Sequence, residues 1–347
     1  MARMALEHGN PRMLVSHLAL YGLMSILEEK APTAVVRGWW SGGMAPRPVV
    51  EAEGLEEEAI GEAVRGHADT RASDSAWPAA RAPHVDAALL SPRMRAPTEL
   101  GAWRELLQAR HGVVDALTAD RALLDLRMIG GLGELSHWHR GPDGRPRPDS
   151  AASRYDMQAR NRGSNLVHTK IAKLARIVAA RTAPEVTDGL AGEELTDEMA
   201  AGEPSRSATG FAPLGFVDNA VAWCAFWGLA ALPVAPRAGR PSITSTFLPR
   251  GKGVPESAVV PLWTRPMRPA RLRALLADDR LPVAAAESPD GGDNAGGIVA
   301  KEGAARWLAA RGVVALVRFP IEVHGSQNAP ERRAARGELL EVGRGER

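Results

Sequence analysis

Cysteine is almost absent from this sequence, whose 347 residues include only Cys224. A single cysteine excludes an internal disulfide framework and any zinc module that depends on several cysteines. Cys224 lies in an apolar stretch that predicts a buried helix, where a thiol more often packs than reacts. The sequence therefore offers no cysteine-based site.

Lysine is also scarce, because only five of the 43 basic residues are lysines: Lys30, Lys170, Lys173, Lys252 and Lys301. Positive charge comes almost entirely from arginine, which suits bidentate contacts with phosphate. Abundant alanine, glycine and proline point to a simpler origin, a gene rich in G and C. The net charge is only +2, so the arginine excess alone does not decide the function.

No apolar run is long enough to cross a membrane. The longest, residues 13–27, is interrupted by polar residues and falls short of the about 20 apolar residues that a span requires. The first residues are polar and break at Asn10-Pro11, so they lack the apolar segment of a secretory signal. We expect a cytoplasmic protein without membrane contact.

Apolar periodicity predicts an α+β (mixed) fold, in which buried helices pack on small antiparallel sheets in an arrangement compatible with two subdomains. Helices are expected over residues 11–29, 55–65, 99–111, 165–181, 219–232, 268–279 and 302–312. Strands are expected over residues 33–40, 46–53, 122–133, 242–249, 257–263 and 313–323. Asn10 and either Asp218 or Asn219 are expected to cap the two most apolar helices.

Two of these helices have a defined apolar face. The face of the first is formed by Leu100, Trp103, Leu106 and Leu107. The face of the second is formed by Val167, Ile171, Leu174 and Val178. Spacings of three and four residues place such side chains on one side of a helix.

An acidic segment divides the chain into two predicted domains. Residues 185–203 carry seven acidic side chains and no basic one, which is typical of a surface helix or a mobile linker. We therefore expect an N-terminal α/β domain with a basic loop and helix over residues 1–183. An acidic linker or surface helix is expected over 184–210, and a C-terminal α/β domain over 211–347.

Motifs that carry chemistry are missing. There is no phosphate-binding G-x-x-x-x-G-K-[ST] loop and no G-x-S-x-G nucleophile elbow. The run from Gly130 to Gly133 follows a predicted strand and favours a β-bulge or tight turn over a dinucleotide loop. We therefore predict no catalytic residue and no cofactor.

His137 and His139 form the best candidate for a metal site. Two histidines at i and i+2 on a strand point to the same side, and Asp143 or His111 would complete the ligand set. A pair of exposed or hydrogen-bonded histidines at a strand end is the alternative interpretation, and it is the one that we favour.

Charge is distributed unevenly along the chain. Residues 140–181 hold ten basic and three acidic side chains, and residues 237–273 hold eight basic and one acidic, so each block has a net charge of +7. Basic blocks of this kind can form a surface stripe that neutralises phosphates and binds nucleic acid in a salt-dependent way. A single stripe requires that the two blocks share one face.

Within these blocks we predict a nucleic-acid-binding set of ten residues: Arg140, Arg145, Arg147, Arg160, Asn161, Arg162, Lys170, Lys173, Arg250 and Lys252. The arginines would grip phosphates, and Asn161 would reach a base edge. Residues 160–165 alternatively form a polar loop that caps the following helix, and residues 250–253 an ordinary solvated turn. Trp39, Trp40 and Trp138 could stack on bases or anchor a neighbouring subunit.

Several stretches resemble the large-subunit family of type I CRISPR effector (Cascade) complexes, especially its type I-U/I-G branch. The first is LVSHLALYGLMSILEE followed by VRGWWSGG, and the second is NAVAWCAFWGLAALPV followed by TSTFLP and VVPLWTRPMRPARLRALL. The third is WLAARGVVALVRFPIEVHG. Together these patches cover about half of the chain, and none is diagnostic alone. The chain is shorter than most large subunits, and residues 313–323 indicate a strand where the family has a C-terminal helical bundle.

The resemblance implies a non-catalytic subunit of an RNA-guided antiviral defence complex. Such a subunit helps recognise the short motif beside the target, contacts the opened DNA strands and recruits the helicase-nuclease. Its partners would be guide RNA, target DNA and the other effector subunits, while sequence specificity would come from guide pairing.

Two alternatives from other classes remain open. A protein-interaction scaffold would use its tryptophans and acidic segments to bind partner proteins, with the arginines merely solvated. A metal-dependent hydrolase would be built around His137 and His139.

Overall fold

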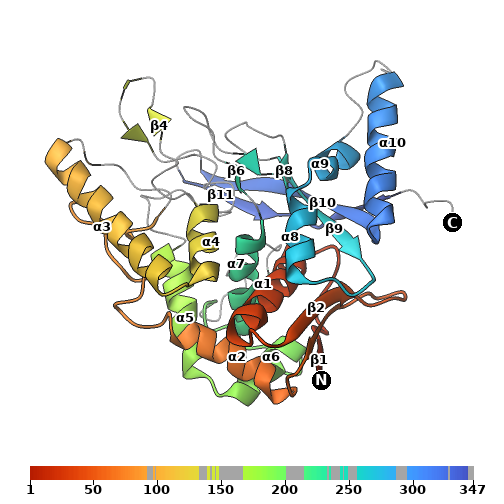
Figure 1. The fold of residues 1–347 in the computed structure, drawn as a ribbon, viewed down its shortest axis with the longest axis horizontal. Coiled ribbons are helices and arrows are strands. Elements are labelled where there is room, and N and C mark those ends of the chain that lie inside the picture. Colours follow the sequence, from red (N-terminus) through yellow and green to blue (C-terminus); the bar gives the residue numbers. More distant parts are fainter. Residues whose placement is uncertain are drawn as a thin grey trace.

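The computed structural model describes residues 1–91, 97, 99–132, 139–140, 143–144, 146–147, 167–200, 215–232, 234–235, 243–244, 246–248, 256–286, 295–326 and 329–342. Within these ranges the predicted α+β fold is confirmed, because helices pack around small antiparallel sheets (Figure 1). No helix in these ranges has both the length and the hydropathy that crossing a membrane requires.

The chain begins with a three-stranded sheet that supports a long buried helix. Strands β1 (Ala2–Ala5), β2 (Val35–Trp40) and β3 (Pro48–Glu53) pair antiparallel in the order β1-β3-β2. Helix α1 (Leu14–Lys30) packs against β2 and β3, and every residue from Leu14 to Leu27 is buried. A helix that is apolar all round has to be enclosed on all sides.

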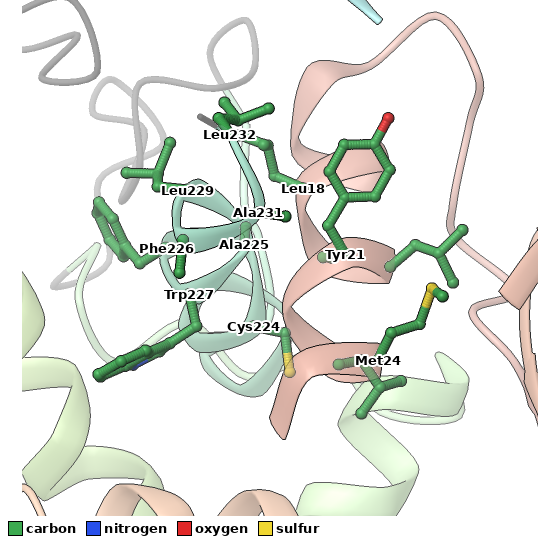
Figure 2. Packing of buried hydrophobic residues seen from close by; sticks show 14 of the residues in the cluster. Leu18, Tyr21, Met24, Cys224, Ala225, Phe226, Trp227, Leu229, Ala231 and Leu232 are labelled. Atoms are coloured by element: carbon green, nitrogen blue, oxygen red, sulfur yellow. The ribbon is translucent and has the colours of Figure 1, made fainter. Parts of the chain in front are cut away.

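Helix α7 (Asn219–Gly228), with the 3-10 turn Leu229–Ala231, lies along α1 at the centre of the core (Figure 2). A Cβ atom added to Gly22 would overlap the carbonyl oxygen of Cys224, and one added to Gly228 would overlap that of Leu18. The two backbones therefore touch, and this close approach requires glycine. The cap of α7 is Asp218, whose carboxylate accepts a hydrogen bond of 2.7 Å from the Ala220 amide.

Three further helices enclose one side of this pair: α2 (Glu58–Asp69), α5 (Ala172–Ala180) and α6 (Ala183–Ala191). A π-helical turn, Val167–Ile171, leads into α5. The predicted apolar face of this segment is confirmed, because its four members are fully buried.

The acidic segment begins as helix α6, whose first turn has a capping box formed by Thr182 and Glu185. Val186 and Leu190 are buried, and Gly61 of α2 lies directly against Thr187. Of the two alternatives for this segment, residues 183–191 are therefore a surface helix with one face in the core.

The C-terminal part contains the larger sheet. Strand β10 (Val313–Ser326) pairs with β9 (Ser257–Trp263) on one side and with β11 (Ala329–Ala334) and β12 (Glu338–Glu341) on the other. Strand β8 (Phe247–Leu248) extends the sheet beyond β9. Helices α9 (Arg280–Ala285) and α10 (Ala295–Ala310) contact this sheet through β9 and β10, whereas α8 (Pro269–Ala277) contacts α1 and β2. The described residues also include two short hairpins: β4 (His139–Arg140) with β5 (Pro146–Arg147), and β6 (Val234–Ala235) with β7 (Ile243–Thr244).

The predicted strand over residues 122–133 is wrong, because this segment forms helix α4 (Leu123–Leu132). Its buried residues include Leu124, Met128 and Leu132, which recur at helical spacing. Gly130 and Gly131 lie inside the helix, so the predicted β-bulge or turn is wrong as well. The continuous apolar run concealed this period, since a short run of that kind suits a buried strand equally well.

Helix α1 starts at Leu14, so the predicted cap at Asn10 is also wrong. Residues 10–13 form a turn, in which Asn10 Oδ1 accepts a hydrogen bond of 2.8 Å from the Arg12 amide. The carbonyl of Pro11 accepts a hydrogen bond of 2.8 Å from His17 Nε2. A tertiary contact of a histidine side chain therefore holds this turn outside the helix.

Helix α3 (Leu100–Ala119) is longer than predicted, and its buried face differs from the expected one. Leu106 and Arg110 are buried, whereas Leu100 is 61% exposed. The Arg110 guanidinium donates a hydrogen bond of 2.7 Å to the carbonyl of Leu89. This tertiary contact, which composition does not reveal, turns the helix toward the loop before it.

One hydrophobic cluster runs from Ala2 to Val342 and includes residues from both predicted domains. Helix α1 belongs to the predicted N-terminal domain and α7 to the predicted C-terminal domain, yet the backbones of these two helices are in contact. The boundary itself stays a prediction, but the described parts of both halves share one core.

Candidate nucleic-acid interface

Most of the predicted nucleic-acid-binding residues lie outside the described residues. This holds for Arg145, Arg160, Asn161, Arg162, Arg250 and Lys252, as it does for His137 and Trp138. Arg140 and Arg147 belong to the β4–β5 hairpin, where Arg140 pairs with Pro146 and His139 with Arg147. Lys170 is half-buried in the π-helical turn, and Lys173 is exposed on α5.

Two arginines of the first basic block, Arg176 and Arg181, are neutralised locally. Arg176 pairs with Asp74 at 2.6 Å. Arg181 pairs with Glu198 at 2.6 Å and with the buried Asp218 at 3.1 Å. These contacts hold the helices together and reduce the positive charge that this block can present to a ligand.

Three arginines of the second basic block instead face solvent, whereas Arg273 pairs with Glu28 at 2.9 Å. Arg265, Arg268 and Arg271 are exposed and three residues apart, just before and within α8. Pro269, at the first position of the helix, starts α8, and its buried face consists of Pro269, Leu272, Leu275 and Leu276. Burial of this apolar face directs the arginines outward.

A groove of about 530 Å³ lies between α8 and the C-terminal part of α10. Its lining residues are Met267, Arg271, Ala274, Leu275, Asp278, Trp307, Ala310 and Arg311. Met267 is held in place by two backbone hydrogen bonds to Gly38 of β2, of 2.9 and 3.0 Å. The core sheet therefore fixes the position of one wall.

Arginine side chains surround the indole of Trp307. The Arg311 guanidinium carbon lies 3.4 Å from the ring centroid, and that of Arg280 lies 4.6 Å from it. Arg311 Nη1 donates to the Trp307 carbonyl at 3.2 Å, and Arg271 Nη2 donates to the Arg311 carbonyl at 3.2 Å. Arginines at the carboxyl end of a helix satisfy carbonyls that have no partner in the helix.

The groove carries more positive than negative charge. Asp278 is the acidic residue of its lining, and Arg280 already pairs with it at 3.2 Å. Arg271 and Arg311 remain exposed beside it. Arg265 also lies close by, because a Cβ atom added to Gly312 would be 3.9 Å from its Cδ atom. Clustered guanidinium groups around an apolar floor are suited to binding phosphate.

The described part of the chain brings no group of three or more His, Cys, Asp or Glu side chains together for a metal ion. Burial raises the pKa of the Cys224 thiol far above its usual range, and it lowers the pKa of His17 to about 4. Burial, followed by the charges of Arg71 and Lys30, also holds the pKa of His67 well below its usual range. These groups lie in the core, away from the groove residues.

A second cluster of polar residues lies in the core around Arg71, which is 6% exposed. Its guanidinium pairs with Asp125 of α4 and with Glu29 of α1 and donates to the carbonyl of His67. The Trp77 indole donates a hydrogen bond of 2.6 Å to Asp125. Every nitrogen of this arginine is used within the protein, so the cluster connects elements of the fold and offers no donor to a ligand.

The predicted stacking role of Trp39 and Trp40 is wrong. Trp40 is fully buried and Trp39 is 9% exposed, under the guanidinium of Arg3. Both belong to β2, against which α1 packs. The prediction missed Trp307 and the arginines around it, although a signal was present. Trp307 and Arg311 are four residues apart in a predicted helix, and Arg265, Arg268 and Arg271 recur every third residue.

Comparison with family models, with curated proteins and with solved structures found no match to this chain. Its function is therefore inferred from its own residues.

Proposed function

We propose that this chain is a non-catalytic nucleic-acid-binding subunit of an RNA-guided type I surveillance complex. Its role would be to help recognise the motif beside the target, to hold target DNA and to recruit the helicase-nuclease. The observation that supports nucleic-acid binding is the groove between α8 and α10, whose lining includes Arg271, Trp307 and Arg311. Guanidinium groups next to an apolar floor are suited to a phosphate backbone and its sugars.

Two of the stretches that resemble the Cascade large subunit supply the two walls of this groove. The stretch 259–276 includes Met267 and Arg271, and the stretch 307–325 begins with Trp307 and includes Arg311. The resemblance and the uncompensated charge therefore point to the same part of the chain.

Salt-dependent binding tests the proposal. Full-length protein is titrated with fluorescent single-stranded and duplex DNA at several salt concentrations. A double variant, Arg271→Ala with Arg311→Ala, should bind at least about tenfold more weakly. Its slope of log affinity against log salt should be shallower by about 1 to 2, since each lost phosphate contact removes slightly less than one unit.

The matched control is Arg65→Ala, which removes an arginine of α2 that pairs with Glu62 on the surface. It should leave affinity and slope unchanged. If the control weakened binding as much as the groove variant, the loss would come from the overall charge of the protein and not from a site in the groove. Complete absence of binding by the wild-type protein would refute nucleic-acid binding and favour a scaffold that contacts only proteins.

Membership of a complex is tested by purifying the tagged protein from its native cells. Short RNAs of uniform length with repeat-derived ends, together with several other subunits, are the expected result. Recovery of the protein alone and without RNA would refute the surveillance-complex assignment.

A further inference from the structure

Trp307 has a role in the groove that differs from that of a base-stacking tryptophan. An indole that stacks on a base needs a free face, because the base ring has to lie in van der Waals contact with it. In this groove the Arg311 guanidinium already lies 3.4 Å from the ring centroid, and that of Arg280 lies 4.6 Å from it. The Arg311 guanidinium thus lies over the ring at about the distance where a stacked base would lie.

The same contacts orient the arginines. Cation–π contact with the indole and the hydrogen bond to the Trp307 carbonyl hold Arg311. The hydrogen bond to the Arg311 carbonyl holds Arg271. A guanidinium has five N–H donors, so each of these side chains keeps donors for a ligand after its contact with the protein. Side chains that are already ordered lose less conformational entropy on binding.

Outside its arginines, which can contact either phosphates or guanine, the lining is poorly suited to reading bases. Recognition of adenine or cytosine in a groove uses carboxamide or carboxylate side chains. Among the residues that the structure describes, the lining contains neither asparagine nor glutamine, and its carboxylate, Asp278, is paired with Arg280. The other members, Met267, Ala274, Leu275 and Ala310, are apolar and can only contact sugars or ring surfaces.

We propose that this groove binds the sugar–phosphate backbone and does not read bases, with Trp307 as a positioning residue that holds Arg311 toward the phosphates. The inference rests on the proposed nucleic-acid-binding function and specifies its ligand chemistry. Affinity at this site would be independent of base sequence and sensitive to salt, so that any sequence preference of an assembly would come from other contacts.

Three single-stranded DNA probes of equal length separate backbone from base recognition. The first has mixed sequence, the second has abasic residues with all phosphates intact, and the third keeps its bases but has uncharged methylphosphonate linkages. Full-length protein should bind the abasic probe within about twofold of the mixed probe. It should bind the uncharged probe at least about tenfold more weakly, since the charge-assisted contacts are lost.

The variant Trp307→Ala tests the positioning role. If Trp307 orients arginines, the variant should weaken binding of the mixed and abasic probes by the same factor. If Trp307 instead stacked on a base, its removal would weaken binding of the mixed probe alone, by about fivefold or more. Trp307→Phe keeps an aromatic face beside the guanidinium groups and should restore part of the affinity for both probes. It also serves as the second variant if alanine at this position disturbs folding.

The outcomes distinguish this inference from the proposed function. Strong binding of the mixed probe with weak binding of the abasic probe would overturn backbone recognition and leave nucleic-acid binding intact. An effect of Trp307→Ala on the mixed probe alone would lead to the same conclusion. Absence of binding to all three probes would remove the proposed function and this inference with it.

Discussion

Two of the arginine–tryptophan contacts among the described residues contrast the core of this protein with its surface. In the core, the guanidinium carbon of Arg71 is 4.6 Å from the ring centroid of Trp227. In the groove, that of Arg311 is 3.4 Å from the ring centroid of Trp307. The contacts are alike, but the surroundings differ.

The difference lies in the carboxylates. Arg71 is nearly enclosed and pairs with both Asp125 and Glu29, so its charge is neutralised inside the protein. Arg271 and Arg311 are exposed and donate to a backbone carbonyl, which leaves their charge uncompensated. A buried arginine needs its partners in the fold, whereas an exposed one can accept a partner from outside.

The largest expected effect comes from breaking the core cluster. Asp125→Ala removes a buried partner of Arg71 and the acceptor of the Trp77 indole, so we expect a loss of about 3–5 kcal/mol in the free energy of unfolding. Urea unfolding measures it. The matched control is Asp74→Ala, because Asp74 pairs with Arg176 at the surface and should contribute less than about 1 kcal/mol. Similar losses in the two variants would contradict the difference between buried and exposed carboxylates.

Acid should also weaken the core. His17 is fully buried and has a pKa of about 4, so it stays neutral in the folded protein while the unfolded chain takes up a proton near pH 6.5. Stability is therefore lost as the pH falls below about 6.5, by about 1.4 kcal/mol per pH unit and about 3 kcal/mol in total by pH 4. His67, whose pKa is also lowered, adds to the loss in the same direction.

Unfolding free energies at pH 7, 6 and 5 measure this slope. His17→Phe removes one titrating group, so its slope between pH 6 and 5 should be smaller than that of the wild-type protein by about 1.2 kcal/mol per pH unit. An unchanged slope would show that His17 does not titrate as its burial requires.

Alanine substitutions of two helical glycines, one in the core and one at the surface, should have opposite effects on stability. Gly22→Ala places a Cβ atom on the Cys224 carbonyl and should cost about 1–3 kcal/mol or more through overpacking. Gly112→Ala in the exposed helix α3 meets no atom within 4 Å and should gain about 0.5–1 kcal/mol, because alanine favours helices. Thermal unfolding measures the change in stability of both variants. A change of the same sign in the two variants would contradict the backbone contact between α1 and α7.

The smallest expected effect on stability belongs to the groove. The double variant Arg271→Ala with Arg311→Ala should change the free energy of unfolding by no more than about 0.5 kcal/mol, since both side chains are exposed. Its defect should be confined to binding. If the double variant lost as much free energy of unfolding as Asp125→Ala, these arginines would stabilise the fold and would not be available to a ligand.

Much of the fold follows from local patterns. The buried helices α1 and α7, the strands β2, β3, β9 and β10 and the apolar face of Val167, Ile171, Leu174 and Val178 were predicted from apolar spacing. Helix α4 was not, because a short apolar run is compatible with either a strand or a helix. Strands β11 and β12 were missed as well, since their charged residues carry no apolar alternation and they form by pairing with β10.

By itself the sequence determined the class of fold, the abundance of arginine and the two blocks in which it gathers. These are properties of composition and of short-range spacing, which a linear chain displays directly. Only the tertiary structure decided which arginines remain uncompensated. The acidic partners of Arg71, Arg176 and Arg181 come from residues 17 to more than 100 positions away in the chain. Neutralisation of a charge depends on distance in space, and that distance is set when the helices pack.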